Sequence, residues 1–101
     1  MLIYNETFII DDAIETDWLQ YIKNTHIPAI LATGAFDSHK VLNVLDSPNE
    51  GVTYCLQFQT DKVERYSDFY YKHVEEIHAN HNKNFEERFA LFHTVMEEVE
   101  L

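Results

Sequence analysis

Basic residues are scarce in this sequence of 101 residues. Seven Lys and Arg stand against eighteen Asp and Glu, which gives a formal net charge of −11. The seven are spread along the chain and form no patch: Lys23, Lys40, Lys62, Arg65, Lys72, Lys83 and Arg88. A negative field of this kind repels polyanions, so we expect no binding to nucleic acid or to an acidic membrane surface.

Cysteine, glycine and proline are also rare, and long hydrophobic runs are absent. Cys55 is the single cysteine, so the core has to form without an intrachain disulfide. The first residues show neither the basic segment nor the apolar run of a signal peptide, and no stretch is long enough to cross a bilayer. We therefore expect a cytoplasmic protein. Two glycines and two prolines leave little room for loops.

Hydrophobic residues, in contrast, are abundant: they make up 46% of the chain, and aromatic residues make up 14%. A disordered chain does not carry so much apolar surface. At this length the composition predicts a single globular domain over residues 1–101.

Alternation of polar and apolar side chains predicts four strands, over residues 2–10, 36–46, 52–60 and 89–99. In the first strand one face carries Leu2, Tyr4, Phe8 and Ile10, and the other carries Ile3, Asn5, Thr7 and Ile9. Turn residues at 47–51 indicate a hairpin between the second and third strands.

Two amphipathic helices lie between these strands. The first begins after Asp11 and Asp12, and its apolar stripe is Trp18, Leu19, Ile22, His26, Ala29 and Ile30. We expect it to break and restart near His26-Ile27-Pro28, because Pro28 disfavours a helical conformation at the residue before it. The second begins after Asp61, with the stripe Val63, Tyr66, Phe69, Tyr70, His73, Val74, Ile77 and His81.

The order strand, helix, strand, strand, helix, strand predicts an α+β fold. This is the ferredoxin-like βαββαβ plait, a four-stranded antiparallel sheet with both helices on one face. Several strands are apolar on both sides, although two helices cover only one face of such a sheet. We therefore expect a homodimer that packs one open sheet face on the other as a dimeric α/β barrel. The alternative is a monomer whose open face is polar enough to stay in water, because it carries these polar residues: Asn5, Thr7, Asn43, Thr53, Gln57, Gln59 and Thr94.

Histidines are the first candidates for chemistry. His26 lies on an apolar helical stripe and is a candidate proton donor or acceptor, because imidazole titrates near neutral pH. The favoured interpretation is structural: a hydrogen bond from His26 to a backbone carbonyl that Pro28 leaves free. His73, His78 and His81 suggest a metal site, but only His78 and His81 are one helical turn apart. The HExxH and CxxC patterns are absent, and Glu75, Glu76 or Glu86 would have to complete the site. We predict no metal and no cofactor.

The sequence resembles a family of small bacterial proteins, typical of the Bacteroidetes, that carries only a domain-of-unknown-function label. The resemblance spans essentially the whole chain, and its most specific parts are His26-Ile27-Pro28 and Ala32-Thr33-Gly34 followed by Phe36. It implies the dimeric α/β-barrel fold, which cofactor-independent monooxygenases of antibiotic biosynthesis and haem-degrading enzymes also have. His93 departs from the family pattern, in which an arginine precedes the threonine.

The resemblance adds further candidate site residues. In dimeric α/β barrels an asparagine of the first strand and a histidine of the second helix can line a pocket, which points to Asn5 with His73 or His81. The alternative is that Asn5 and Thr7 are polar residues of the dimer interface and bind no ligand. Haem-degrading members also have a tryptophan near that pocket, whereas Trp18 lies on the first helix here. The residues that we expect to line a ligand pocket are Trp18, Tyr66, Tyr70 and His81.

These observations predict a cytoplasmic homodimer that binds a small ligand or has a structural role, with no established catalysis. One alternative is a cofactor-independent oxygenase acting on a small aromatic substrate, with Asn5, His26 and His73 as candidate catalytic residues beside Tyr70. The other is a haem- or metal-binding protein that uses the histidines of the second helix.

Overall fold

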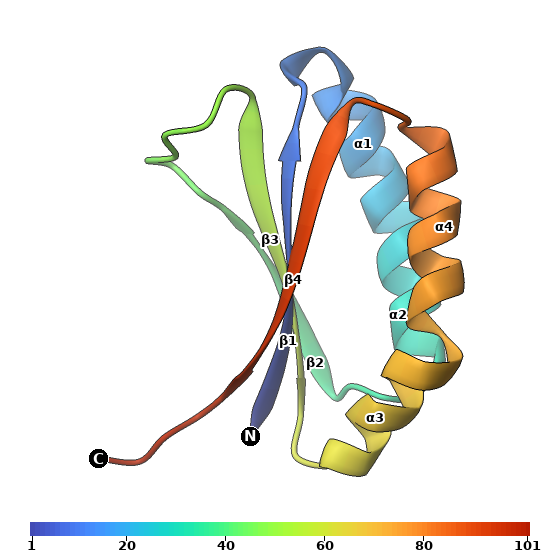
Figure 1. Ribbon diagram of the computed structural model, residues 1–101, viewed down its shortest axis with the longest axis vertical. Helices are drawn as coiled ribbons and strands as arrows, with labels where there is room; N and C mark the ends of the chain where they lie inside the picture. The colour runs from blue at the N-terminus through green and yellow to red at the C-terminus, as the bar shows by residue number, and fades with distance from the viewer.

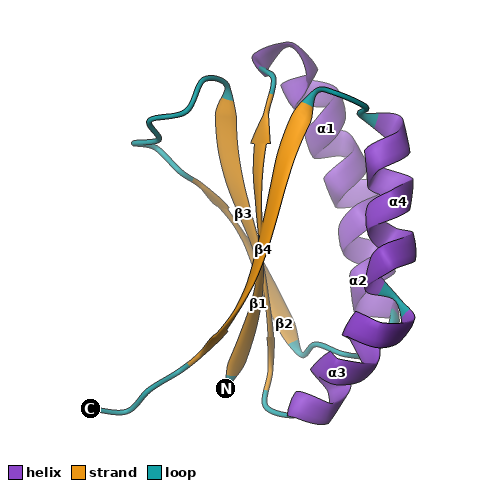
Figure 2. Cartoon of the chain, in the orientation of Figure 1, coloured by secondary structure: helices purple, strands orange, loops and turns teal.

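The computed structural model describes residues 1–101 as one antiparallel sheet under one layer of helices (Figure 1). The strands are β1 (Leu2–Ile10), β2 (Ser38–Asn43), β3 (Val52–Thr60) and β4 (Phe89–Glu97), in the spatial order β2-β3-β1-β4. The helices are α1 (Glu15–Tyr21), α2 (Ile27–Ala32), α3 (Val63–Lys72) and α4 (Val74–Asn84), and all lie on the same side of the sheet (Figure 2). The predicted ferredoxin-like plait is confirmed.

Strand β1 runs through the middle of the sheet and pairs with both β3 and β4. Its side chains alternate as the sequence predicts, so that Tyr4, Phe8 and Ile10 are buried under the helices. Glu6 occupies the same face and is fully buried. In the ladder Glu6 lies opposite Leu56 of β3 and His93 of β4. The buried face of β1 therefore has a carboxylate at its centre.

The first α-helix is interrupted and restarts at Ile27, near the predicted position, but the interruption is a wider helical turn and not a break in the chain's helical path. Between α1 and α2 the chain forms one π-helical turn, η2 (Ile22–His26), in which the amide of Ile27 donates to the carbonyl of Ile22, five residues back. Proline has no amide hydrogen, and its ring clashes with the carbonyl four residues earlier. The wider turn relieves this clash at Pro28 and lets the helix continue. A short 3-10 turn, η1 (Asp12–Ile14), precedes α1 and is capped by the Asp11 carboxylate.

The second helical segment is interrupted where the sequence predicted continuity. His73 leaves the helical conformation, with φ −128° and ψ −36°, and separates α3 from α4. The predicted buried stripe is therefore only half right. Its buried members are Phe69, Val74, Ile77 and His81, whereas Val63, Tyr70 and His73 are exposed. A single periodicity does not describe both halves, because the interruption changes the direction in which each half faces.

The core lies between the sheet and the helical layer and is largely aromatic. The Tyr4 ring contacts Phe36, Phe58 and Phe69, with centroids 5.2 to 6.2 Å apart. Phe36 comes before β2, which is shorter than the predicted strand.

The other face of the sheet has no cover and leaves large apolar side chains in solvent: Leu42 is 42% exposed, Phe92 58% and Met96 41%. None of the helices has the length and the apolar character needed to span a membrane.

Candidate functional site

A carboxylate with three polar partners forms the centre of the candidate site. Glu6 Oε1 lies 2.7 Å from His26 Nε2. Glu6 Oε2 lies 2.5 Å from His78 Nε2 and accepts a 2.7 Å hydrogen bond from the Tyr4 hydroxyl. A buried carboxylate is very costly without such partners. Here β1, η2 and α4 together supply them.

The charge of this carboxylate is set by its hydrogen bonds. Burial by itself raises the pKa of Glu6, but the hydrogen bonds from His26 and His78 outweigh it and lower the pKa to about 2. Glu6 is therefore ionised at neutral pH, and each imidazole points a donor at it. Burial and the neighbouring Glu6 charge raise the pKa of Tyr4 well above its usual value, so its hydroxyl keeps its proton and donates.

His26 is held at the end of the π-helical turn and is fully buried. The expected hydrogen bond to a carbonyl freed by Pro28 does not form, because the ring turns toward the sheet and binds Glu6 instead. Its other nitrogen, Nδ1, has no hydrogen-bond partner. With Nε2–H donating to Glu6, Nδ1 is a buried acceptor that no group satisfies, which costs about 1–3 kcal/mol.

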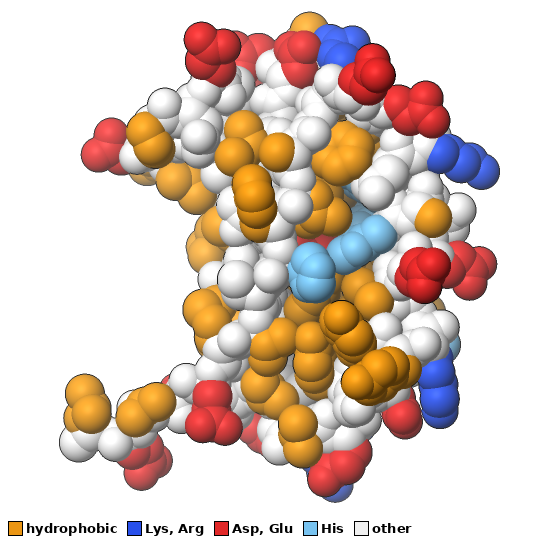
Figure 3. All heavy atoms as spheres, viewed as in Figure 1, with side chains coloured by type: hydrophobic (Ala, Val, Ile, Leu, Met, Phe, Trp, Pro, Cys, Tyr) orange, Lys and Arg blue, Asp and Glu red, His pale blue; other side chains and the backbone are white.

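His78 connects this buried centre to the surface. Its side chain is 15% exposed. Its ring lies 5.9 Å, centroid to centroid, from that of His93, which is exposed on β4. His93 in turn lies 6.3 Å from the Tyr4 ring. In the space-filling view histidine side chains gather on the face between β4 and the helical layer (Figure 3). The polar group formed by Glu6, Tyr4, His26, His78 and His93 is called the Glu6 network below.

His81 is a separate, wholly buried histidine. The Trp18 indole donates a 2.9 Å hydrogen bond to His81 Nε2, and His81 Nδ1 lies 3.0 Å from the side-chain oxygen of Asn82. Nε2 must be unprotonated to accept from an indole, which has no acceptor of its own. Burial lowers the pKa of His81 to about 4, in agreement with a neutral ring at neutral pH.

The structure does not bring the predicted catalytic candidates together. Asn5 faces the open side of the sheet, where it donates a 2.9 Å hydrogen bond to Thr7 and accepts a 3.3 Å bond from Gln57. It therefore cannot line a pocket with His73 or His81, which belong to the helical side. His73 is exposed at the junction of α3 and α4. Of the three candidates, His26 alone lies in the Glu6 network.

The four predicted pocket residues also separate. Trp18 and His81 are core residues that bind each other. Tyr66 packs against Tyr4 and Tyr70, with centroids 6.0 and 6.2 Å apart. None of the four lines a cavity.

The histidines of the second helical segment point to three different places. His73 faces solvent, His78 binds Glu6 and His81 binds Trp18. No group of three or more His, Cys, Asp or Glu side chains has an arrangement suited to a metal ion.

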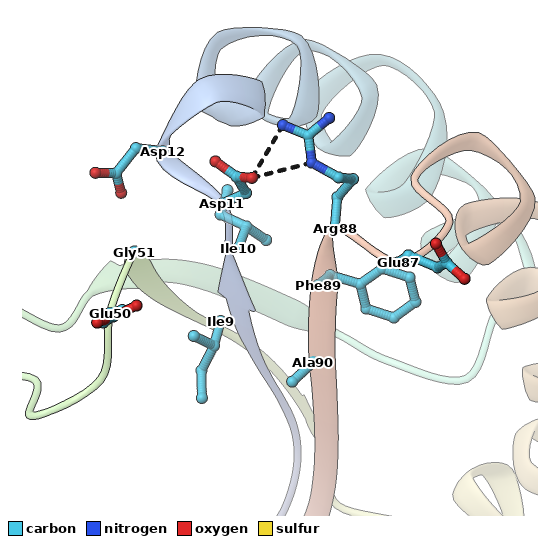
Figure 4. Close-up of a pocket in the computed structure, with 10 residues that line it drawn as sticks. All are labelled: Ile9, Ile10, Asp11, Asp12, Glu50, Gly51, Glu87, Arg88, Phe89 and Ala90. Atoms are coloured by element: carbon cyan, nitrogen blue, oxygen red, sulfur yellow. Dashed lines mark hydrogen bonds and ion pairs between the residues drawn. The ribbon is translucent and has the colours of Figure 1, made fainter.

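The largest cavity, of about 700 Å³, lies at one end of the sheet, away from the Glu6 network. Its acidic and basic lining residues are Asp11, Asp12, Glu50, Glu87 and Arg88. The Arg88 guanidinium lies 3.0 Å from the Asp11 carboxylate (Figure 4). This end of the sheet is therefore acidic, and its one cation is already paired.

Glu6 is the residue that the sequence reasoning missed. A signal was present, because Glu6 is the only charged residue on the strand face that carries Leu2, Tyr4, Phe8 and Ile10. An isolated acid at a core position needs a buried partner, and six histidines were available. Which histidines reach it depends on the two helical irregularities, at His26 and at His73.

Comparison with known families matches residues 1–99 to the family described as "Domain of unknown function (DUF4286)". The chain belongs to this family. No curated protein is significantly similar to this DUF4286 chain.

Solved structures of the same fold have very different sequences. The DUF4286 chain is similar to an ethyl tert-butyl ether d (EthD) family protein from Bacillus halodurans, at 15% identity and TM-score 0.68, with 98% of this chain and 100% of that chain covered. A dimeric ferredoxin-like protein from an uncultured marine organism has 12% identity and TM-score 0.68, with 100% and 97% covered. SnoaB, a cofactor-independent oxygenase from Streptomyces nogalater, has 9% identity and TM-score 0.64, with 99% and 94% covered. These likenesses establish the fold alone.

Proposed function

We propose that this protein is a homodimer that binds a small molecule with an ionisable hydroxyl at the surface end of the Glu6 network. The observation that carries the proposal is the buried, ionised Glu6, which holds His26 and His78 at once. His78 presents its second nitrogen, Nδ1, away from Glu6. Because Nε2 faces the carboxylate, Nδ1 can accept a hydrogen bond from the hydroxyl of a ligand.

A purely structural role explains this arrangement less well. Replacing buried ion pairs by apolar residues of similar volume is often neutral or stabilising. Stability alone therefore does not explain why this whole set of polar residues, rather than an apolar set of similar volume, fills the site. The unsatisfied Nδ1 of His26 adds a further cost that an apolar ring does not carry. Such costs are typical of sites where polar groups serve binding or proton transfer.

The surroundings of His78 favour a planar aromatic ligand. Ring contacts run without a gap from Tyr70 through Tyr66 and Tyr4 to His93 and His78. Aromatic side chains bind planar rings by stacking and edge contacts, and the imidazoles supply the polar end. A phenol matches both features, because it combines one ring with one ionisable hydroxyl.

The test is binding of 4-nitrophenol, whose absorbance reports its ionisation, measured by calorimetry and by titration of the visible spectrum. We expect saturable binding that His78→Phe and His93→Phe each weaken by about tenfold, the loss of one charge-assisted hydrogen bond. The matched control is His73→Phe, since His73 is exposed on the same helical segment and does not contact the network.

His93→Phe keeps every hydrogen bond of Glu6, so a folding defect in the His78 variant does not prevent the test. The proposal fails if 4-nitrophenol shows no saturable binding. It also fails if both variants bind the probe as tightly as the unaltered protein does.

The dimeric state is part of the same proposal. The open sheet face carries Leu42, Phe92 and Met96 in solvent, and contiguous apolar surface of this kind marks association sites. Asn5, Thr7, Gln57 and Thr94 lie among them and bind one another, so they bring few unpaired groups to an interface. The dimeric ferredoxin-like protein of the same fold supports a homodimer.

We also propose that the protein works in the cytoplasm of a bacterium. The single cysteine, which is free, suits a reducing compartment. Fractionation of native cells, followed by detection of the protein, tests this location.

A further inference from the structure

A second site lies on the other flank of the helical layer and shares no residue with the Glu6 network. It is a groove of about 390 Å³ between β2 and the segment formed by α1, η2 and α2. Its apolar lining is Leu19, Ile22, Ile27 and Val41. Its ionisable lining is Lys23 and His39, and Gln20 is the remaining polar residue. The volume lies in the range of small-molecule sites, which are mostly apolar with a few placed polar groups.

The groove exists because the helices do not cover the edge strand. All six residues of β2 are exposed. His39 and Val41 nevertheless face the helical side, because they lie opposite Phe58 and Leu56, which are buried there. The His39 ring stacks on Phe58, with centroids 6.0 Å and planes 21° apart. This contact holds the imidazole at the groove, beside the buried side chains of Ile22 and Ile27.

The charge in the groove is opposite to that of the whole molecule. The chain has eighteen acidic residues and a net charge of −11, yet no acidic residue lines this groove. Its ionisable groups are one of the seven Lys and Arg residues and one histidine. A cationic ligand meets like charge here, and an uncharged apolar ligand leaves Lys23 without a partner. An anion with an apolar body uses both the charge and the apolar lining.

We propose that this groove binds a small amphipathic carboxylate. Its aliphatic or aryl part lies over Leu19, Ile22, Ile27 and Val41, and its carboxylate pairs with Lys23 and His39. The proposal is independent of the proposed function, because neither Glu6 nor His78 takes part in it.

The probe is decanoate, used below its micelle concentration and compared with 1-decanol and decyltrimethylammonium, which have similar chains. Binding is followed by amide chemical shifts in NMR spectra of the full-length protein. We expect decanoate to move amides of residues 19–27 and 38–43 and to bind more tightly than the alcohol. We expect the cation to bind elsewhere on the acidic surface.

The decisive variant is the double substitution Lys23→Gln with His39→Gln. An exposed ion pair with Lys23 and a hydrogen bond from His39 contribute a few-fold each, so decanoate binding is expected to weaken by about five- to tenfold while decanol binding stays unchanged. The matched control is Lys83→Gln with His73→Gln, which removes the same residue types at exposed positions outside the groove. All four side chains are exposed, so both double variants are expected to fold.

Three results overturn the proposal. The first is equal affinity for decanoate and decanol, or tighter binding of the cation in the groove. The second is an equal loss of decanoate affinity in the two double variants. The third is a set of groove shifts that depend on protein concentration and not on decanoate, which assigns the groove to a second copy of the chain.

Discussion

At the scale of single residues, Glu6 shows how burial and partners compete. Burial alone favours the neutral acid, and the hydrogen bonds from two imidazoles reverse that preference by lowering the pKa of Glu6. The alternation of β1 determines that Glu6 faces inward. His26 and His78, which lie 20 and 72 positions further along the chain, stabilise the buried carboxylate by hydrogen bonds.

Replacing Glu6 by Gln tests this balance. The amide keeps the shape but brings an amino group toward His26 or His78 and removes the charge that both imidazoles contact. Removing one partner of a buried pair costs about 3–5 kcal/mol. We expect a loss of that size in the free energy of unfolding, measured with urea at pH 7. Glu50→Gln, in an exposed turn, is the control and is expected to change little. A loss below about 1 kcal/mol in the Glu6 variant would contradict an ionised, paired Glu6.

His81 predicts how stability depends on pH. Its folded-state pKa of about 4 lies below the ordinary histidine value of 6.5, because burial disfavours the charged ring. Below pH 6.5 His81 binds a proton in the unfolded chain but stays neutral in the folded chain. The contribution of His81 to stability is therefore complete above pH 6.5 and is lost as the pH falls toward 4. The loss is on the order of 3 kcal/mol.

The measurement is urea denaturation at pH 7 and pH 5. We expect His81→Phe to reduce the difference in unfolding free energy between the two pH values, although it lowers stability at both by leaving the Trp18 indole unpaired. His39→Gln removes an exposed histidine and is expected to leave the difference unchanged. An unaltered difference in the His81 variant would show that His81 is not the neutral, buried group described above.

At the scale of elements, most of the architecture was predictable because short-range patterns determine it. β1 and β3 match their predicted ranges at both ends, since each alternates over nine residues. The helical irregularities were harder to predict. Pro28 signals a disturbance, but whether the chain breaks or widens into a π turn depends on packing around it. No local signal marks the interruption at His73.

Two glycines with positive φ allow a matched test of turn geometry. Gly51 has φ 86°, and a Cβ there collides with the backbone carbonyl of Ile10. Gly34 has φ 75°, but a Cβ there meets no other atom within 4 Å. We expect Gly34→Ala to cost about 1 kcal/mol from conformation alone, and Gly51→Ala to cost about 3 kcal/mol or more, because strain and collision add. Thermal denaturation of the two variants checks this order. Equal melting temperatures would show that the contact with Ile10 relaxes without cost.

At the scale of the whole molecule, the uncovered sheet face is the dominant feature. Helices occupy one side of the sheet, so its other side remains in solvent unless another chain covers it (Figure 2). Its apolar side chains are hydrophobic surface that a second copy removes from water.

Phe92→Asp tests the proposed dimer. A charge on the open face is expected to convert dimer to monomer, as measured by light scattering after size exclusion at micromolar concentration. Tyr71→Asp is the control, because Tyr71 is 81% exposed on α3, on the helical side. Its variant is expected to keep the mass of the dimer. A monomeric unaltered protein at high micromolar concentration would refute the dimer.

The sequence by itself determined the acidic character, the order of elements and the inward face of each long strand, because composition and periodicity are local properties. It also showed that one sheet face stays apolar without helices to cover it. Only the tertiary structure decided which histidines meet Glu6 and that a groove opens beside β2. Those contacts join residues far apart in the chain, and a single π turn or a single interruption in a helix changes which side chains face each other.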